Sequence, residues 1–176
     1  MTIVIVAFSL LTMQSPQSAA IVPPPHVRPQ GVRSEDILKD AIKRSPTVAG
    51  LVKVIERSPI IVFIELAYDR EDLGRTTILA ANDIARLLHV QLNGKLSADR
   101  LVEVLGHELT HAIEILREPE VRDDSSLARV FTRVGFEMER GHFETDAAQQ
   151  AELQVHTELT MERAARRGKG KKPLSS

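Results

Sequence analysis

Two histidines and a glutamate in the stretch "LGHELTHAIEIL" are the residues of this 176-residue chain with the clearest potential for chemistry. His107 and His111 stand four positions apart, and Glu108 directly follows the first histidine. Residues four apart lie on one side of a helix, so two imidazole nitrogens can hold one metal ion. The adjacent carboxylate can then take a proton from a water on that ion. The motif predicts metal-assisted hydrolysis, and its alternative is a helix face with two hydrogen-bonded histidines and an unrelated glutamate.

A third protein ligand must come from another segment, because one helix face cannot enclose a tetrahedral ion. The segment "GHFETDAAQQAELQVHTELTMERAARR" predicts a long helix that starts near His142, with Glu144 at the head of its buried face. Burial of a carboxylate is unfavourable unless it meets a cation, so we expect Glu144 to complete a site for one Zn²⁺ per chain. His142 is a second candidate, either as a ligand in place of Glu144 or as a transition-state donor, unless it is a solvated residue at a helix start.

The motif His107-Glu108-x-x-His111, followed by Glu144-Thr145-Asp146-Ala147, resembles the gluzincin-type zinc metallopeptidases over about residues 86 to 160. This resemblance implies a minimal zincin-like domain that hydrolyses peptide bonds. It also implies roles for single residues: His107, His111 and Glu144 as zinc ligands, Glu108 as the catalytic base, and Asp146 as the residue that orients a ligand histidine.

Two further points follow from the comparison with that family. The strand "ARLLHVQL" would be similar to the edge strand along which such enzymes hold an extended substrate. The chain departs from the family because no counterpart of the oxyanion-stabilising tyrosine or histidine is evident, Tyr68 being the only tyrosine and far upstream. Glu114 follows His111 by three positions, where it either bonds the free N–H of that histidine or is solvated.

The helix that carries the motif is predicted over about residues 98 to 118, capped by Ser97 and stopped before Pro119. Upstream, residues 34 to 57 predict two short helices, the first capped by Ser34 and the second by Ser45 with a proline in its first turn. Downstream, "SSLARVFTRVGFEM" predicts a short helix capped by Ser125 or Ser126.

Three apolar runs, "IIVFIELAY", "TTILA" and "ARLLHVQL", predict strands. The fold expected from these elements is α+β, with a small antiparallel sheet packed on the motif helix. A C-terminal helix is expected to carry the third ligand.

The two ends of the chain predict separate segments. Residues 1–20 resemble a signal peptide cleaved near Ala20, although no lysine or arginine precedes its apolar run, and an ordinary strand is the alternative. We expect a proline-rich linker over 21–33, the metallopeptidase domain over 34–167, and a basic disordered tail over 168–176 that alternatively contacts anionic lipid or cell-wall polymer. The mature chain would be exported, periplasmic or extracellular, without stable membrane insertion.

Composition narrows the function further. The formal net charge is −1 and only 3% of residues are aromatic, so nucleic acid is not an expected partner. A peptide or protein substrate is expected instead, and the composition gives no indication of its identity or of the oligomeric state. Two alternatives stay open: a non-catalytic, zinc-stabilised binding module, and a regulatory protease for one protein partner. The intact Glu108 favours an enzyme, because a purely structural metal needs no water-activating carboxylate.

Overall fold

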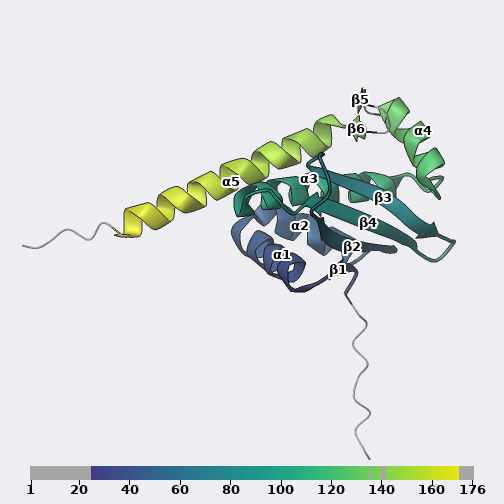
Figure 1. Cartoon of the computed structure of the whole chain (residues 1–176). Coiled ribbons are helices and arrows are strands. Elements are labelled where there is room, and N and C mark those ends of the chain that lie inside the picture. Colours follow the sequence, from purple (N-terminus) through teal and green to yellow (C-terminus); the bar gives the residue numbers. More distant parts are fainter. Residues whose placement is uncertain (1–24, 135, 140–141, 171–176) are drawn as a thin grey trace, which may run out of the picture.

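The computed structural model describes residues 25–134, 136–139 and 142–170, with residues 131, 134, 136–139, 142, 143, 169 and 170 described by their backbone. Helices and strands combine in an α+β fold, as the sequence predicts (Figure 1). The elements are β1 (Val27–Pro29), α1 (Val32–Arg44), α2 (Pro46–Ile55), β2 (Ile60–Ala67), β3 (Gly74–Ala81), β4 (Arg86–Asn93), α3 (Ala98–Arg117), α4 (Asp124–Val134), β5 (Phe136–Glu139), β6 (His142–Glu144) and α5 (Asp146–Gly170).

The main sheet is mixed, so the prediction of an antiparallel sheet is wrong. Its strand order is β1-β2-β4-β3, in which β1, β2 and β4 are parallel and only β3 runs antiparallel to its neighbour. Two helices, α1 and α2, connect β1 to β2, and a crossover of that kind joins parallel strands. Whether neighbouring strands run parallel therefore depends on the helical connection between them, and the residues of the strands alone do not indicate it.

The edge strands of this sheet are β1 and β3, which corrects the expectation that the "ARLLHVQL" strand lies at an edge. That strand, β4, is paired on both sides, with β2 and with β3. Burial explains the order, because Leu88, Val90 and Leu92 of β4 are fully buried, whereas β3 leaves Leu79 56% exposed. The most apolar strand occupies the centre and the more polar one the edge.

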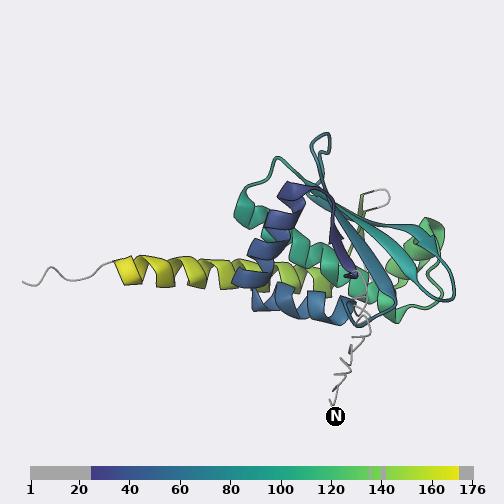
Figure 2. The same cartoon turned by 90° about the horizontal axis from the view of Figure 1, so that it is seen from below.

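The motif helix α3 lies between the sheet and α5 (Figures 1 and 2). Helices α1, α2 and α3 pack on one face of the sheet, and α5 packs on the other side of α3. Most residues of α3 are consequently buried, including both histidines. Gly106 permits the close approach of α5, since a Cβ on this residue would lie 2.8 Å from Cγ2 of Val155. The fold thus encloses the predicted site between two helices.

Two of the three serine caps predicted for the first helices are present. Ser45 and Ser97 cap α2 and α3 by accepting from the backbone N–H groups of Val48 and Arg100, as predicted. Ser34 is not a cap: α1 starts at Val32, and the buried Ser34 hydroxyl donates to the carbonyl of the residue four positions earlier.

The proline-rich segment 21–33 is not a linker over its second half. Residues Val27–Pro29 form β1, which pairs in parallel with β2, and α1 begins three residues later. The side chain of Glu56 holds this strand by accepting from the backbone N–H groups of His26 and Val27 at 2.9 and 3.0 Å. The domain therefore begins before residue 34, and residues 21–24 lie outside the described part.

The predicted starts of the last two helices need correction. Asp123, rather than Ser125 or Ser126, caps α4, because its carboxylate accepts from the backbone N–H of Ser126 at 2.7 Å. Thr145 caps α5 by accepting from the backbone N–H of Ala148 at 3.1 Å, so α5 begins at Asp146. Glu144 is the last residue of β6, and the prediction that the C-terminal helix carries this residue is wrong.

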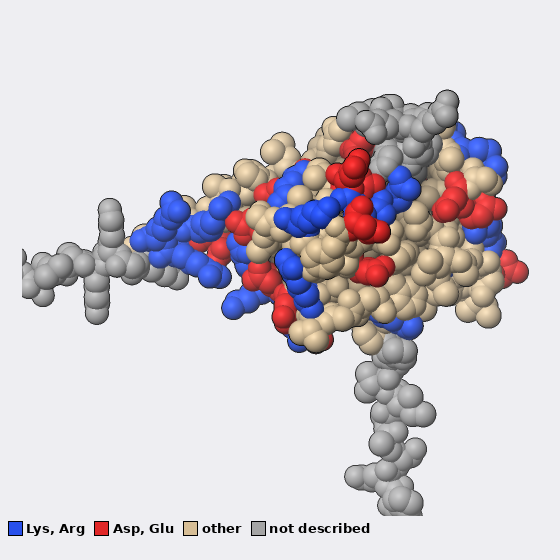
Figure 3. Space-filling view, viewed as in Figure 1, with Lys and Arg blue, Asp and Glu red and all other residues tan. Residues whose placement is uncertain are grey.

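The ends of the chain are only partly described. Helix α5 continues to Gly170, so residues 168–170 belong to its last turn rather than to a disordered tail. The rest of the predicted tail and the predicted signal peptide lie outside the described residues. Within the described residues, the helices are too short or too polar to cross a membrane. Figure 3 shows lysine and arginine side chains gathered over the C-terminal end of α5.

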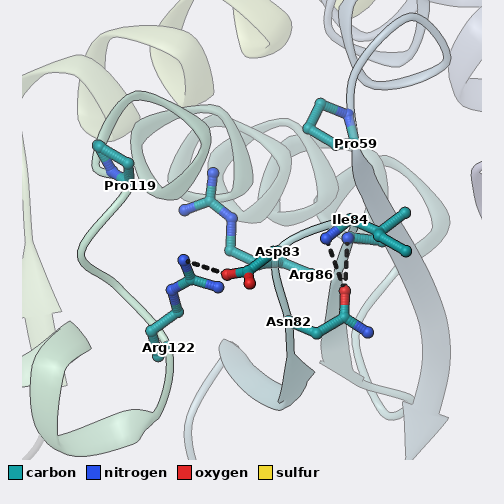
Figure 4. A pocket seen from close by; sticks show the side chains of 8 residues that line it. Pro59, Asn82, Asp83, Ile84, Arg86, Pro119 and Arg122 are labelled. Carbon is teal, nitrogen blue, oxygen red and sulfur yellow. Dashed lines mark hydrogen bonds and ion pairs between the residues drawn. The ribbon is translucent and has the colours of Figure 1, made fainter.

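A buried arginine fixes the C-terminal end of α3 to the sheet (Figure 4). Arg86, the first residue of β4, donates from its guanidinium to the backbone carbonyls of Ile115, Leu116 and Glu118. These carbonyls lie at the helix end, where the helix dipole also favours a cation. Those of Ile115 and Glu118 accept in addition from backbone N–H groups three residues later. A cavity of about 140 Å³ beside this contact is also lined by Arg122, whose guanidinium lies 3.1 Å from the carboxylate of Asp83.

Replacing Arg86 by methionine is expected to destabilise the fold by about 2–4 kcal/mol, because the three carbonyls at the helix end lose the guanidinium donors. The same change at Arg122 is the matched control. Its partner Asp83 is 97% exposed, so the loss should stay below about 0.5 kcal/mol. Urea unfolding of both variants measures the difference, and equal destabilisation would show that Arg86 does not anchor the helix.

Candidate metal centre

Three donor atoms from two separate elements meet beside α3. The Nε2 atoms of His107 and His111 lie 3.0 Å apart. The Oε1 atom of Glu144, at the end of β6, lies 3.4 Å from Nε2 of His107. The structure thus brings together the three residues that the sequence predicts as ligands, although Glu144 arrives on a strand instead of a helix.

These distances are close to those of ligands around one tetrahedral ion. Nitrogen ligands at about 2.0–2.1 Å from zinc are roughly 3.3–3.4 Å apart, so the two imidazoles would need to separate by about 0.3 Å. No group of three or more His, Cys, Asp or Glu side chains in the described part has the arrangement of a ready-made metal site. The donor set, two imidazoles and a carboxylate, nevertheless fits zinc, and the change in position is within the freedom of a side-chain rotation.

The second ring nitrogen of His111 is held by Glu114. Oε2 of Glu114 lies 2.8 Å from Nδ1 of the histidine, and the hydroxyl of Thr145 donates to Oε1 at 2.7 Å. The sequence left two alternatives for Glu114, a hydrogen bond to His111 or a solvated side chain. The hydrogen bond is present, and the side chain is only 15% exposed. This contact directs Nε2 of His111 toward the other donor atoms.

The second ring nitrogen of His107 lies beside Glu152, a residue that the sequence analysis did not single out. Oε2 of Glu152 is 3.0 Å from Nδ1, off the line of an N–H donor, so the contact is an ion pair. Arg100 holds the other carboxylate oxygen at 2.5 Å. One signal was available, since Glu152 stands four residues after the buried Ala148 and three before the buried Val155, on the stripe that meets α3.

Asp146 does not occupy the position that the resemblance implies. It is exposed in the first turn of α5, and Glu152, rather than Asp146, is the carboxylate beside His107. Because Thr145 caps the helix, Asp146 faces solvent at a helix start, where a carboxylate is favourable. The side chain of His142 lies outside the described residues. Tyr68 is engaged elsewhere, by a 2.6 Å hydrogen bond from Arg33.

Glu108 is buried against the edge strand β3. The hydroxyl of Thr76 donates to Oε2 of this glutamate at 2.7 Å. Gly74 leaves room for the carboxylate, since a Cβ there would lie 2.7 Å from Oε1. Burial raises the pKa of Glu108, and His111, His107 and the Thr76 hydroxyl oppose this only in part. A buried carboxylate with a raised pKa is suited to accept a proton.

Carboxylates dominate the electrostatics around the histidines. Burial alone would lower the pKa of His107, but Glu144 and Glu152 outweigh it and raise the pKa from 6.5 to about 10. The contact with His107, followed by the charge of Arg100, outweighs burial and lowers the pKa of Glu152 to about 2. The pKa of Glu144 is also lowered, because its contact with His107 outweighs its burial. Such an excess of carboxylates favours a cation among them, which is either the protonated ring of His107 or a metal ion bound to its neutral form.

No protein-family description matches the chain, and no curated protein and no solved structure is significantly similar to it. The resemblance to gluzincins therefore stays a prediction from the motif residues.

Replacing Gly74 by alanine is expected to lower stability by about 1–3 kcal/mol, because the new methyl group overlaps Glu108 and Val104. Gly50 of α2 is the matched control. A Cβ at this exposed position meets no atom within 4 Å, so Gly50→Ala should stabilise the helix by about 0.5–1 kcal/mol. Thermal melting of the two variants measures both shifts, and a Gly74→Ala protein as stable as the wild type would contradict the close approach of β3.

Proposed function

We propose that this protein is a zinc-dependent metallopeptidase that hydrolyses peptide bonds by means of an activated water. The observation that carries the proposal is the convergence of three donor atoms, from His107, His111 and Glu144, next to a buried carboxylate. The distances of 3.0 and 3.4 Å between these atoms support one shared ion. The proposal rests on the chemistry of the side chains and not on a relative.

The chain's own residues supply the proton transfers. A bound Zn²⁺ would polarise the substrate carbonyl and acidify the attacking water. Glu108 takes the proton of that water and later delivers it to the amine that leaves, which is the usual task of a single positioned carboxylate in hydrolysis. Thr76 fixes one oxygen of Glu108 through its 2.7 Å hydrogen bond, so that the carboxylate keeps one orientation.

A non-catalytic zinc-stabilised module is the second candidate. The position of Tyr68 favours it, because the phenol is bonded to Arg33 and packs on Gly94 rather than beside the three donors. The burial of Glu108 favours the enzyme, since a carboxylate without a proton-transfer role gains nothing from an environment that raises its pKa. We therefore place hydrolysis first.

Purified protein is expected to bind one zinc ion per chain and to lose it in His111→Ala and Glu144→Ala, because each change removes a donor atom. Elemental analysis after dialysis measures the content. His89→Ala is the matched control: this histidine also pairs with a carboxylate, Glu65 at 2.9 Å, but lies in the sheet. Equal zinc in the wild type and Glu144→Ala would remove that residue from the ligand set.

A further inference from the structure

A cavity of about 490 Å³ adjoins the candidate centre between α3 and α5. His107 and Glu144 line it together with residues from the first turns of α3 and the first half of α5. Two of the proposed metal ligands thus form part of its wall, so a peptide held at the metal would place a neighbouring group in this cavity.

The charged groups in the wall are arranged around one guanidinium. Arg100 lies 2.9 Å from Glu103 and 2.5 Å from Glu152, and thus bridges the two carboxylates. The second oxygen of Glu103 lies 2.8 Å from Nδ1 of His156, and the Glu103 side chain is only 9% exposed. If Glu144 is counted with the metal, two carboxylates face one guanidinium. With His156 counted as neutral, one negative charge is left in excess, and Glu103 is the more buried of the two carboxylates.

Two of the exposed residues that line the cavity are leucines, beside the polar Gln149 and His156. Leu73, which precedes β3, and Leu153 of α5 both line it and are 44% and 65% exposed. A long side chain with a methylene stem can cover these leucines while its polar end reaches the carboxylates. An acidic side chain would meet the same carboxylates and be repelled.

We propose that this cavity is a subsite for a cationic group of the peptide substrate, either a lysine or arginine side chain or a free N-terminal ammonium. The proposal rests on the function proposed above, because it assumes a peptide held at the metal. Shape selects a long aliphatic stem, and the excess of carboxylate selects a positive end. Glu103 is the residue that sets this preference, since it is the most enclosed of the three carboxylates in the wall and the other two contact His107.

Binding measurements on the zinc-loaded Glu108→Gln protein test the subsite without cleavage. Fluorescent, N-acetylated alanine-rich peptides with a single lysine, moved position by position, are compared with the same peptides containing norleucine or glutamate. We expect lysine at one position to bind about tenfold more tightly than norleucine, with glutamate weakest. A parallel set with a free N-terminus separates the two sources of positive charge, since only an amine subsite would prefer it to the acetylated set.

Glu103→Gln, made in the same protein, is the matched variant. It should reduce the preference for lysine over norleucine to about twofold or less, while zinc content and norleucine-peptide binding stay unchanged. Equal binding of all peptides, absence of binding, or a preference that survives Glu103→Gln overturns the subsite. If lysine peptides bind preferentially but the wild-type protein cleaves nothing, the subsite is supported and the proposed hydrolysis is contradicted. If the wild type cleaves peptides without a preference for lysine, the hydrolysis is supported and the subsite is contradicted.

Discussion

Glu108→Gln is expected to lower peptide hydrolysis by about 10²–10⁴-fold, because the amide cannot take the proton of the attacking water. Zinc content should stay near that of the wild type, since the three donor atoms belong to other residues. Glutamine has the same size, so its side chain still fits between Gly74 and Thr76. The measurement pairs peptide hydrolysis with elemental analysis on the same preparation.

His107→Ala is the contrasting variant. It should lose zinc and activity together and melt at a lower temperature, because metal binding contributes to folding. Full hydrolysis by Glu108→Gln would disprove the base role of this residue. Zinc-loaded wild-type protein that hydrolyses nothing would instead favour the non-catalytic module.

The motif helix was predictable because its determinants are local. Ser97 supplies the cap at one end and Pro119 follows the other, and the observed helix spans Ala98–Arg117. Within it, the four-residue spacing alone places the Nε2 atoms of His107 and His111 near each other, 3.0 Å apart. A sequence contains all of this information within one continuous segment.

The sheet and its edge were not predictable in the same way. Strand β4 is long and apolar, but whether it lies at the edge or in the centre depends on pairing with β2, which is parallel and distant in sequence. The same limit applies to Glu144. Its approach to His107 depends on the short pair β5 and β6 and on the cap at Thr145, while a continuous helical pattern hides the boundary.

Glu152→Gln is expected to weaken zinc binding by about 10–100-fold, because the residue beside Nδ1 of a ligand histidine sets its orientation and basicity. Glu152 lies 3.0 Å from Nδ1 of His107, and the neutral amide would remove the charge that favours this ring position. Glu114→Gln should act in the same direction through His111, from its 2.8 Å contact. Competition with a chromophoric chelator at fixed pH measures both affinities.

Asp146→Asn is the control variant, because the structure and the family resemblance assign the histidine-orienting role to different residues. The structure places Asp146 in solvent at the start of α5. The zinc affinity of the Asp146→Asn protein should therefore stay within about twofold of the wild type. The resemblance alone assigns the histidine-orienting role to Asp146 and therefore predicts the opposite order of the two variants. A larger loss of affinity in Asp146→Asn than in Glu152→Gln would show that the carboxylate beside His107 does not orient it, and would restore the family's pattern at this site.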